Sequence, residues 1–228
     1  MNKRIKWFLG LSTLITLGLY IIPLGGFVAY PLLMLSTLVH EMGHGLTALM
    51  VGGYFNSFQM WSNGSGVAQI GGFSNRFASA LVSAGGLLGP ACAAALGFIF
   101  SRKEGLARFA FTLLGVFLVA SEFLWVRNTF GWFFVGILSA IYLWLAQQRS
   151  GQLAQAALVF FSLQLSLSVF SRSDYLFTPV AYTAEGVMPS DVAQIANVLF
   201  LPYWFWGGLC GVFSVLVLLF GLRVALKS

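Results

Sequence analysis

The sequence predicts an all-α polytopic membrane protein, with about seven transmembrane helices and a small β-hairpin or re-entrant loop after the second helix. Hydrophobic residues make up 59% of the 228 residues, and charged residues only 8%. Apolar runs long enough to cross a bilayer recur along the chain, and no polar stretch between them is long enough to fold as a soluble domain. We therefore expect residues 1–228 to form a single membrane-embedded domain.

The basic charge of the chain points to lipid and not to nucleic acid. The net charge is +6, but the basic residues stand in short loops and tails between apolar runs, where lipid headgroups are their expected partners. Cys92 and Cys210 both lie within apolar runs and are expected to behave as small hydrophobic residues. The composition therefore indicates a lipid bilayer as a partner and excludes nucleic acid.

The first two apolar runs are expected to form an antiparallel helical hairpin. The first covers residues 7–22 and has no clear small-residue cleavage site, so we interpret it as a retained span and not as a signal peptide. The sequence Pro-Leu-Gly-Gly at residues 23–26 predicts a tight turn into a second helix over residues 27–51. Pro31 lies early in that helix, where its missing amide hydrogen is least harmful.

The stretch from residue 54 to residue 76 differs in character from the apolar runs. Aromatic and aliphatic residues alternate there with Asn, Ser, Gln and Gly, and Ser-Asn-Gly-Ser-Gly at residues 62–66 is a strong turn signal. We expect a small β-hairpin or re-entrant loop, whose edge strand could pair with an unfolded peptide. An ordinary interfacial loop is the alternative interpretation.

Five further apolar runs complete the expected set of spans: residues 77–100, 109–126, 130–145, 153–170 and 200–222. The first of these contains a series of small residues from Ser83 to Gly97, which would let another helix approach closely in lipid. The last contains Pro-Tyr-Trp-Phe-Trp at residues 202–206, an aromatic cluster typical of the membrane interface.

The second predicted helix carries the two histidines of the chain, His40 and His44. Because they stand four residues apart, both imidazoles project from one face of a helix and can hold one metal ion together. Glu41 lies about 100° round the helix, where its carboxylate can reach a metal-bound water without being a ligand. Charged residues inside membrane helices usually line a cavity or a functional site. The pattern therefore predicts a metal site with a general base.

A catalytic zinc site typically has three protein ligands, so a third ligand must come from elsewhere in the chain. Neither cysteine is well placed, which leaves the carboxylates of Glu104, Glu122, Asp174, Glu185 and Asp191. With seven alternating spans, Glu104 falls on the opposite side of the membrane. Ser190-Asp191 before an apolar run is a helix N-cap pattern, which explains Asp191 without a metal. We select Asp174, which directly follows an apolar span, and Asp191 and Glu122 remain open alternatives.

These residues indicate peptide-bond hydrolysis within or beside the membrane. Two histidines and a carboxylate suit zinc better than magnesium or calcium. Zinc would lower the pKa of its bound water to about 7, and Glu41 would take the proton. The resulting hydroxide would attack a carbonyl polarised by the metal, and Glu41 would then deliver the proton to the leaving amine.

The orientation of the chain is predicted from its N-terminus alone, because six basic residues fall on each side of the seven-span arrangement. Lys3, Arg4 and Lys6 lie on the same side as the end of the second helix that carries the histidines. We therefore expect a multi-pass integral membrane protein with its site toward the cytoplasm.

Two stretches of the chain resemble the site-two protease family of intramembrane zinc metalloproteases. They are His-Glu-Met-Gly-His at residues 40–44 and the Gly-rich Gly-Pro helix at residues 85–90, with a hairpin-like loop between them. The similarity is closest to the compact branch that has no PDZ-like module. It implies a metalloprotease domain with zinc held by both histidines and a late aspartate, Glu41 as general base, and membrane-spanning proteins as substrates.

The late aspartate departs from the pattern of that family. The best-known members have a Leu-Asp-Gly motif, whereas Asp174 is followed by Tyr175 and Asp191 by Val192. Two other classes of function stay open. One is a membrane scaffold or regulator that binds metal without turnover, against which the intact Glu41 argues. The other is a small ion transporter with Glu122 in its pathway, against which the lack of an internal repeat argues.

Overall fold

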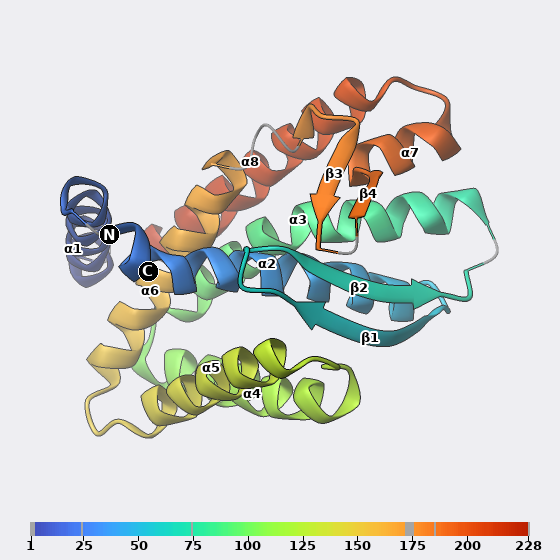
Figure 1. The fold of residues 1–228 in the computed structure, drawn as a ribbon. Coiled ribbons are helices and arrows are strands. Elements are labelled where there is room, and N and C mark those ends of the chain that lie inside the picture. The colour runs from blue at the N-terminus through green and yellow to red at the C-terminus, as the bar shows by residue number, and fades with distance from the viewer. Residues whose placement is uncertain (1–2, 24, 74, 172–175, 185, 228) are drawn as a thin grey trace.

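The computed structural model describes residues 3–23, 25–73, 75–171, 176–184 and 186–227, and Figure 1 shows its ribbon. The α-helices in this part of the chain are α1 (Lys3–Ile21), α2 (Gly25–Met50), α3 (Arg76–Phe100), α4 (Glu104–Leu124), α5 (Thr129–Gln147), α6 (Gly151–Ser171), α7 (Asp191–Leu199) and α8 (Tyr203–Lys227). Two antiparallel hairpins are formed by the strands β1 (Tyr54–Met60), β2 (Gly66–Gly71), β3 (Val180–Thr183) and β4 (Gly186–Pro189).

The long helices coincide with the seven apolar runs of the sequence, and α7 is a short addition. Five of them, α3, α4, α5, α6 and α8, are long and apolar enough to cross a membrane. Among the described residues, α1 and α2 fall outside this set. Basic residues at the start of α1 and the polar residues His40, Glu41 and His44 in α2 lower the apolar character of these helices. A mostly helical chain with candidate membrane-spanning helices is confirmed, whereas the expected count of seven spans is not.

The hairpin predicted after the second helix is present as β1 and β2. It folds back along α2, and side chains of that helix fix its turn. The Thr37 hydroxyl donates a hydrogen bond to the Gly64 carbonyl at 2.8 Å, and the Tyr30 hydroxyl donates to the Ser62 carbonyl at 2.9 Å. These bonds satisfy backbone oxygens of the turn and hold β2 against the helix that carries the histidines (Figure 1).

The outer edge of β1 is closed by the connection between α4 and α5. The Phe58 amide donates to the Trp125 carbonyl at 2.7 Å, and the Arg127 amide donates to the Phe58 carbonyl at 3.0 Å. The Asn128 side chain also accepts from the Met60 amide and donates to the Met60 carbonyl. Within the described ranges β2 pairs with β1 alone, so its second edge is the open edge of this sheet.

Helices α2 and α3 approach closely because glycines face each other at their contact. A Cβ atom added to Gly43 would lie 2.3 Å from the Gly85 carbonyl oxygen, and one added to Gly85 would lie 2.1 Å from Thr47 Oγ1. Larger residues would force the two backbones apart. The small residues of α3 therefore act as the sequence predicted, by allowing a tight helix pair in a setting where van der Waals packing is a main source of association.

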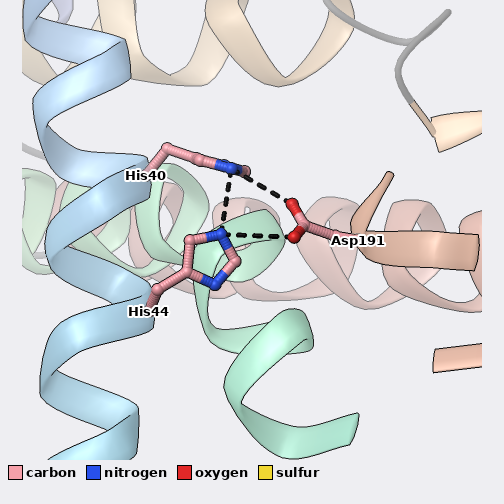
Figure 2. Close-up of side chains that lie close together, drawn as sticks. All are labelled: His40, His44 and Asp191. Atoms are coloured by element: carbon pink, nitrogen blue, oxygen red, sulfur yellow. Dashed lines mark hydrogen bonds and ion pairs between the residues drawn. The ribbon is translucent and has the colours of Figure 1, made fainter. Parts of the chain in front are cut away.

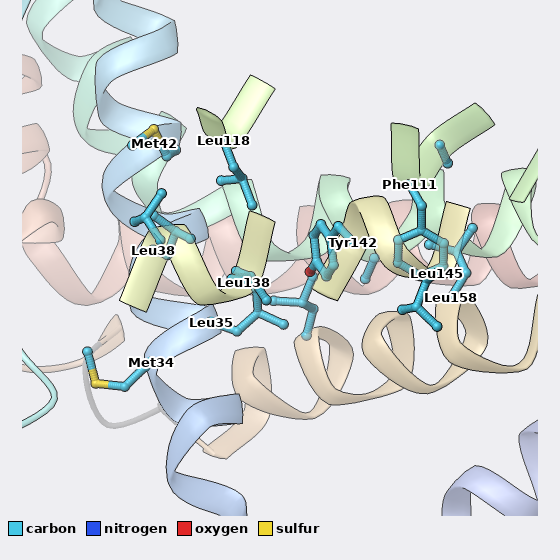
Figure 3. Packing of buried hydrophobic residues seen from close by; sticks show 14 of the residues in the cluster. Met34, Leu35, Leu38, Met42, Phe111, Leu118, Leu138, Tyr142, Leu145 and Leu158 are labelled. Atoms are coloured by element: carbon cyan, nitrogen blue, oxygen red, sulfur yellow. The ribbon is translucent and has the colours of Figure 1, made fainter. Parts of the chain in front are cut away.

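The largest hydrophobic cluster lies between α2 and the helices α4, α5 and α6 (Figure 3). Leu38 and Met42 of α2 and Phe111 of α4 belong to it, and Tyr142 of α5 stacks edge to face on Phe111 with ring centroids 5.2 Å apart. This packing buries one side of α2. The histidines lie on another side of the same helix, so the cluster fixes the helix without covering the site.

The second hairpin and α7 occupy the polar interval before the last span, where the sequence predicted only a helix N-cap. That cap is confirmed: Ser190 Oγ accepts from the Ala193 amide at 3.3 Å. The same hydroxyl donates to the Thr178 carbonyl at 2.6 Å, and the Ser190 amide donates to the Pro179 carbonyl at 3.1 Å. Ser190 thereby ties the start of α7 to the segment that leads into β3.

Candidate metal centre

His40 and His44 project from adjacent turns of α2, and their Nε2 atoms lie 3.2 Å apart. His44 is held by its other ring nitrogen, since Nδ1 lies 2.8 Å from the Val82 carbonyl of α3. A carbonyl oxygen can only accept a hydrogen bond, so Nδ1 carries the hydrogen in the neutral ring. Nε2 is then free to donate a lone pair to a metal ion, which is a common arrangement for ligating histidines.

Asp191 is the first residue of α7, and its carboxylate faces both imidazoles (Figure 2). Oδ2 lies 3.1 Å from His40 Nε2, and Oδ1 lies 3.3 Å from His44 Nε2. Burial raises the pKa of the Asp191 carboxyl, but the positive charge that the neighbouring imidazoles carry when they are protonated outweighs burial and holds the pKa below its usual range. The carboxylate is therefore in the deprotonated form that a metal ion requires.

The spacing of the three side chains fits one tetrahedral ion. Their ligand atoms all lie within 4.8 Å of one another. Two ligands at the bond length of about 2.0–2.1 Å that zinc makes with histidine nitrogen would be separated by about 3.3 Å in a tetrahedral site. The two ring nitrogens lie 3.2 Å apart, close to that value, and each lies 3.1–3.3 Å from a different oxygen of the Asp191 carboxylate. The donor set of two imidazoles and one carboxylate leaves a fourth position open.

Packing of α7 against α3 places Asp191 opposite the histidines. Val192 and Ile195 of α7 are fully or almost fully buried, and they form a cluster with Ala80 and Leu87 of α3. Since α3 also contacts α2 and supplies the carbonyl that holds His44, one helix positions both halves of the site.

Glu41 lies next to the histidines and is 7% exposed. Glu41 and His40 line the same cavity, which has a volume of about 560 Å³. The cavity lies between the turn of the first hairpin and strand β3 of the second hairpin. Gly66 at the start of β2 leaves room for the Glu41 side chain, because a Cβ atom there would lie 2.8 Å from Glu41 Cγ. The carboxylate thus has access to the cavity and is separate from the three grouped ligands.

The walls of this cavity mix polar and apolar residues and carry little charge. Its lining includes small hydroxyl or amide side chains, namely Ser36, Thr37, Asn63, Ser65, Ser168, Thr178, Thr183 and Ser214. Leu87, Pro90 and Leu176 add an apolar patch. Such a lining can accommodate both water and an extended peptide backbone.

The carboxylates weighed from the sequence are in different places. Asp191 joins the histidines, whereas Glu104 forms an ion pair with Arg4 at 2.7 Å and Glu122 lies on α4, outside the group of potential ligands. The predicted ligand Asp174 and the candidate Glu185 lie outside the described residues.

Two contributors to the site were not identified from the sequence. One is the Val82 carbonyl, which no side-chain pattern could reveal. The other is Gly86 of α3, where a Cβ atom would lie 2.2 Å from His44 Nε2. The Gly-Gly pair at residues 85–86 was visible as a signal for close helix packing, but not as the space that the imidazole occupies.

Comparison with known proteins adds one finding. The family model described as Peptidase M50B-like matches residues 11–221 of the chain, which includes both hairpins and all three grouped side chains. No curated protein and no solved structure matches the chain.

Proposed function

Because the chain belongs to the Peptidase M50B-like family, we propose that it is an intramembrane zinc metalloprotease that hydrolyses peptide bonds of membrane-spanning proteins. The observation that carries the proposal is the convergence of His40, His44 and Asp191 on a position for one ion. Five helices able to cross a membrane and the family together support an integral membrane protein.

We assign zinc to the site, with His40, His44 and Asp191 as its ligands. Two nitrogen donors and one oxygen donor at this spacing suit zinc, while magnesium and calcium prefer oxygen ligands in larger number. We propose Asp191 as the third metal ligand, the role for which the sequence had favoured Asp174. The support for this choice is its position within ion-pair distance of both imidazoles.

Zinc bound at this position would supply Lewis-acid activation of water and of the scissile carbonyl. The remaining steps belong to side chains of the protein. Glu41 accepts the proton of the attacking water and afterwards donates it to the leaving amine. The Val82 carbonyl keeps His44 in the tautomer that can bind metal. Ser36, Thr37 and the other hydroxyl groups of the lining keep the cavity wet enough for hydrolysis.

The sequence predicted a cytoplasmic site on the side of the basic N-terminus, but Arg4 pairs with Glu104, beyond the end of α3 that lies away from Val82 and Gly86. The position of the N-terminus therefore does not support a cytoplasmic site. The open edge of β2 offers the backbone groups to which an unwound substrate segment could pair. Substrates would then reach Glu41 and the metal through the cavity between the two hairpins.

The proposal is tested by metal analysis and cleavage assays on the full chain purified in detergent. We expect about one zinc per wild-type chain, and its loss in His44→Ala, since two remaining ligands bind zinc weakly. Glu41→Gln should retain zinc and lose cleavage of a model membrane-spanning peptide by at least about 100-fold. Absence of stoichiometric metal in the wild-type protein would refute the proposed metalloprotease function. Zinc without cleavage in the wild type would favour a metal-binding scaffold instead.

A further inference from the structure

The outer face of α4 and α5 carries a groove that the proposed protease mechanism does not use. Glu122 of α4 lines it together with Trp132, Phe133, Gly136 and Ile137 of α5. Phe133 and Ile137 are 69% and 60% exposed, so the groove opens on the surface of two helices that are apolar enough to cross a membrane. A carboxylate on such a surface calls for an explanation, because an uncompensated charge in lipid is costly.

The carboxylate of Glu122 points into the helix pair and away from the connection between α4 and α5. Helical side chains lean toward the N-terminus of their own helix, which for α4 is the direction away from that connection. Accordingly, a Cβ atom on Gly136 would lie 3.0 Å from Glu122 Oε1. Gly136 stands seven residues beyond Thr129, the start of α5, which corresponds to about 10 Å along the helix.

Glu122 is 9% exposed, and it makes no hydrogen bond or ion pair with any described residue. The basic residue nearest in sequence, Arg127, also lines the groove but is engaged elsewhere. Its guanidinium donates to the Val126 carbonyl at 2.8 Å and to the Phe123 carbonyl at 3.3 Å, at the end of α4. The groove therefore contains a buried acceptor whose cationic partner is missing from the described parts of the chain.

We propose that the Glu122 groove binds a lysine or arginine side chain on a transmembrane helix of a partner protein. A buried carboxylate with no counter-ion is complementary to such a cation, and an ion pair would remove the cost of its charge. The apolar walls formed by Trp132, Phe133 and Ile137 suit the body of a lipid-facing helix. Gly136 provides the small-residue position that allows two helices to approach closely.

Two other occupants fit the groove less well. In the described part of a second copy, the basic residues lie in loops or within about 6 Å of a helix end, so none is anchored at the depth of Gly136. A lipid ammonium group stays at the interface, whereas the carboxylate lies about 10 Å further along the helices than the connection. A long basic side chain anchored on a partner helix can reach that depth.

The test measures association between the full chain and a leucine-rich transmembrane peptide by fluorescence transfer in phosphatidylcholine vesicles. One peptide carries a single lysine about 10 Å from its end, and the matched peptide carries leucine there. We expect the lysine peptide to bind the wild type about five- to thirty-fold more tightly than the leucine peptide, the range typical of polar contacts between membrane helices. Glu122→Gln should abolish the difference, and Glu104→Gln, the same substitution near the other end of α4, should retain it.

Gly136→Leu provides a second variant in case Glu122→Gln folds poorly, because it fills the groove and leaves the carboxylate in place. It should also abolish the preference for lysine. Equal binding of both peptides by the wild type, or an unchanged preference in either groove variant, would overturn the proposal. Loss of the preference when phosphatidylethanolamine is added would also overturn it, by assigning the groove to a lipid ammonium group. None of these results depends on metal binding or peptide cleavage.

Discussion

The candidate site has two walls, one around Glu41 and the first hairpin (the base side) and one around the histidines and Asp191 (the metal side), and they are built in different ways. On the base side, β1 and β2 follow α2 directly and pack against it, so Glu41, Thr37 and Gly66 are brought together by neighbouring parts of the chain. On the metal side, Asp191 reaches the histidines from a helix that begins about 150 residues later. A wall formed by segments that are close in sequence can be recognised from the sequence, whereas a wall formed by the packing of segments far apart in sequence cannot.

This difference assigns separate chemical tasks to the two walls. Under the proposed function, residues of the metal side would determine whether an ion is bound, and residues of the base side would determine whether the bound ion is used. Substitutions on the metal side should therefore change metal content and cleavage together. Substitutions on the base side should change cleavage alone.

Asp191→Asn should have the largest effect on metal binding. An amide lacks the charge of the carboxylate, and it would face two imidazoles that now lie 3.1 and 3.3 Å from its oxygens. We expect zinc affinity to fall by at least about 100-fold, with loss of cleavage. Zinc titration of the purified variants measures this, with Asp174→Asn as the matched control. Normal zinc affinity in Asp191→Asn, with loss in Asp174→Asn, would return the third ligand to Asp174.

Gly86→Ala should reduce metal binding by a steric route. A Cβ atom at this position would lie 2.2 Å from His44 Nε2, and the ring cannot easily turn because Nδ1 is bonded to the Val82 carbonyl. We expect zinc affinity to fall by about ten-fold or more, the effect expected when the orientation of a metal ligand is disturbed. Gly208→Ala in α8, where an added methyl group meets nothing within 4 Å, is the control. Equal zinc affinity in the two variants would contradict the assigned role of Gly86.

The first hairpin was predictable because its signals are local. Alternating polar and apolar residues flank the turn sequence at residues 62–66, and both strands lie within 21 residues of the end of α2. The strands β3 and β4 have only four residues each, which is too short for alternation to stand out from an irregular loop. The sequence therefore predicted one hairpin and missed the other.

Asp191 shows why a correct local interpretation can hide a functional residue. The sequence indicated a helix N-cap at Ser190-Asp191, and the capping side chain is Ser190, which accepts from the Ala193 amide. The Asp191 carboxylate is not needed for the cap and is free to face the histidines. Its position depends on the burial of Val192 and Ile195 against α3, a contact that no sequence pattern of α7 alone specifies.

Gly66→Ala tests the base side in the way that Gly86→Ala tests the metal side. The added methyl group would lie 2.8 Å from Glu41 Cγ and 2.8 Å from Thr37 Cγ2, so one of these side chains must move. We expect cleavage to fall by about ten-fold because a general base acts only within hydrogen-bond reach of its water. Zinc content should stay at the wild-type value. A parallel loss of zinc would mean that the two walls are not independent.

Thr37→Val should have the smallest effect, because it removes a single hydroxyl group and preserves the shape of the side chain. The shorter contact of this hydroxyl, at 2.8 Å to the Gly64 carbonyl, fixes the turn of the first hairpin against α2, while the other reaches the Leu33 carbonyl of α2 itself at 3.4 Å. Such a bond contributes about 0.5–1.5 kcal/mol, so a two- to ten-fold rise in KM for a membrane-spanning peptide is expected, with zinc content unchanged. Ser36→Ala on the same wall is the matched control for removal of a hydroxyl group from the cavity lining. Equal rises in KM for both variants would indicate that polarity of the cavity, and not the position of the hairpin, controls substrate binding.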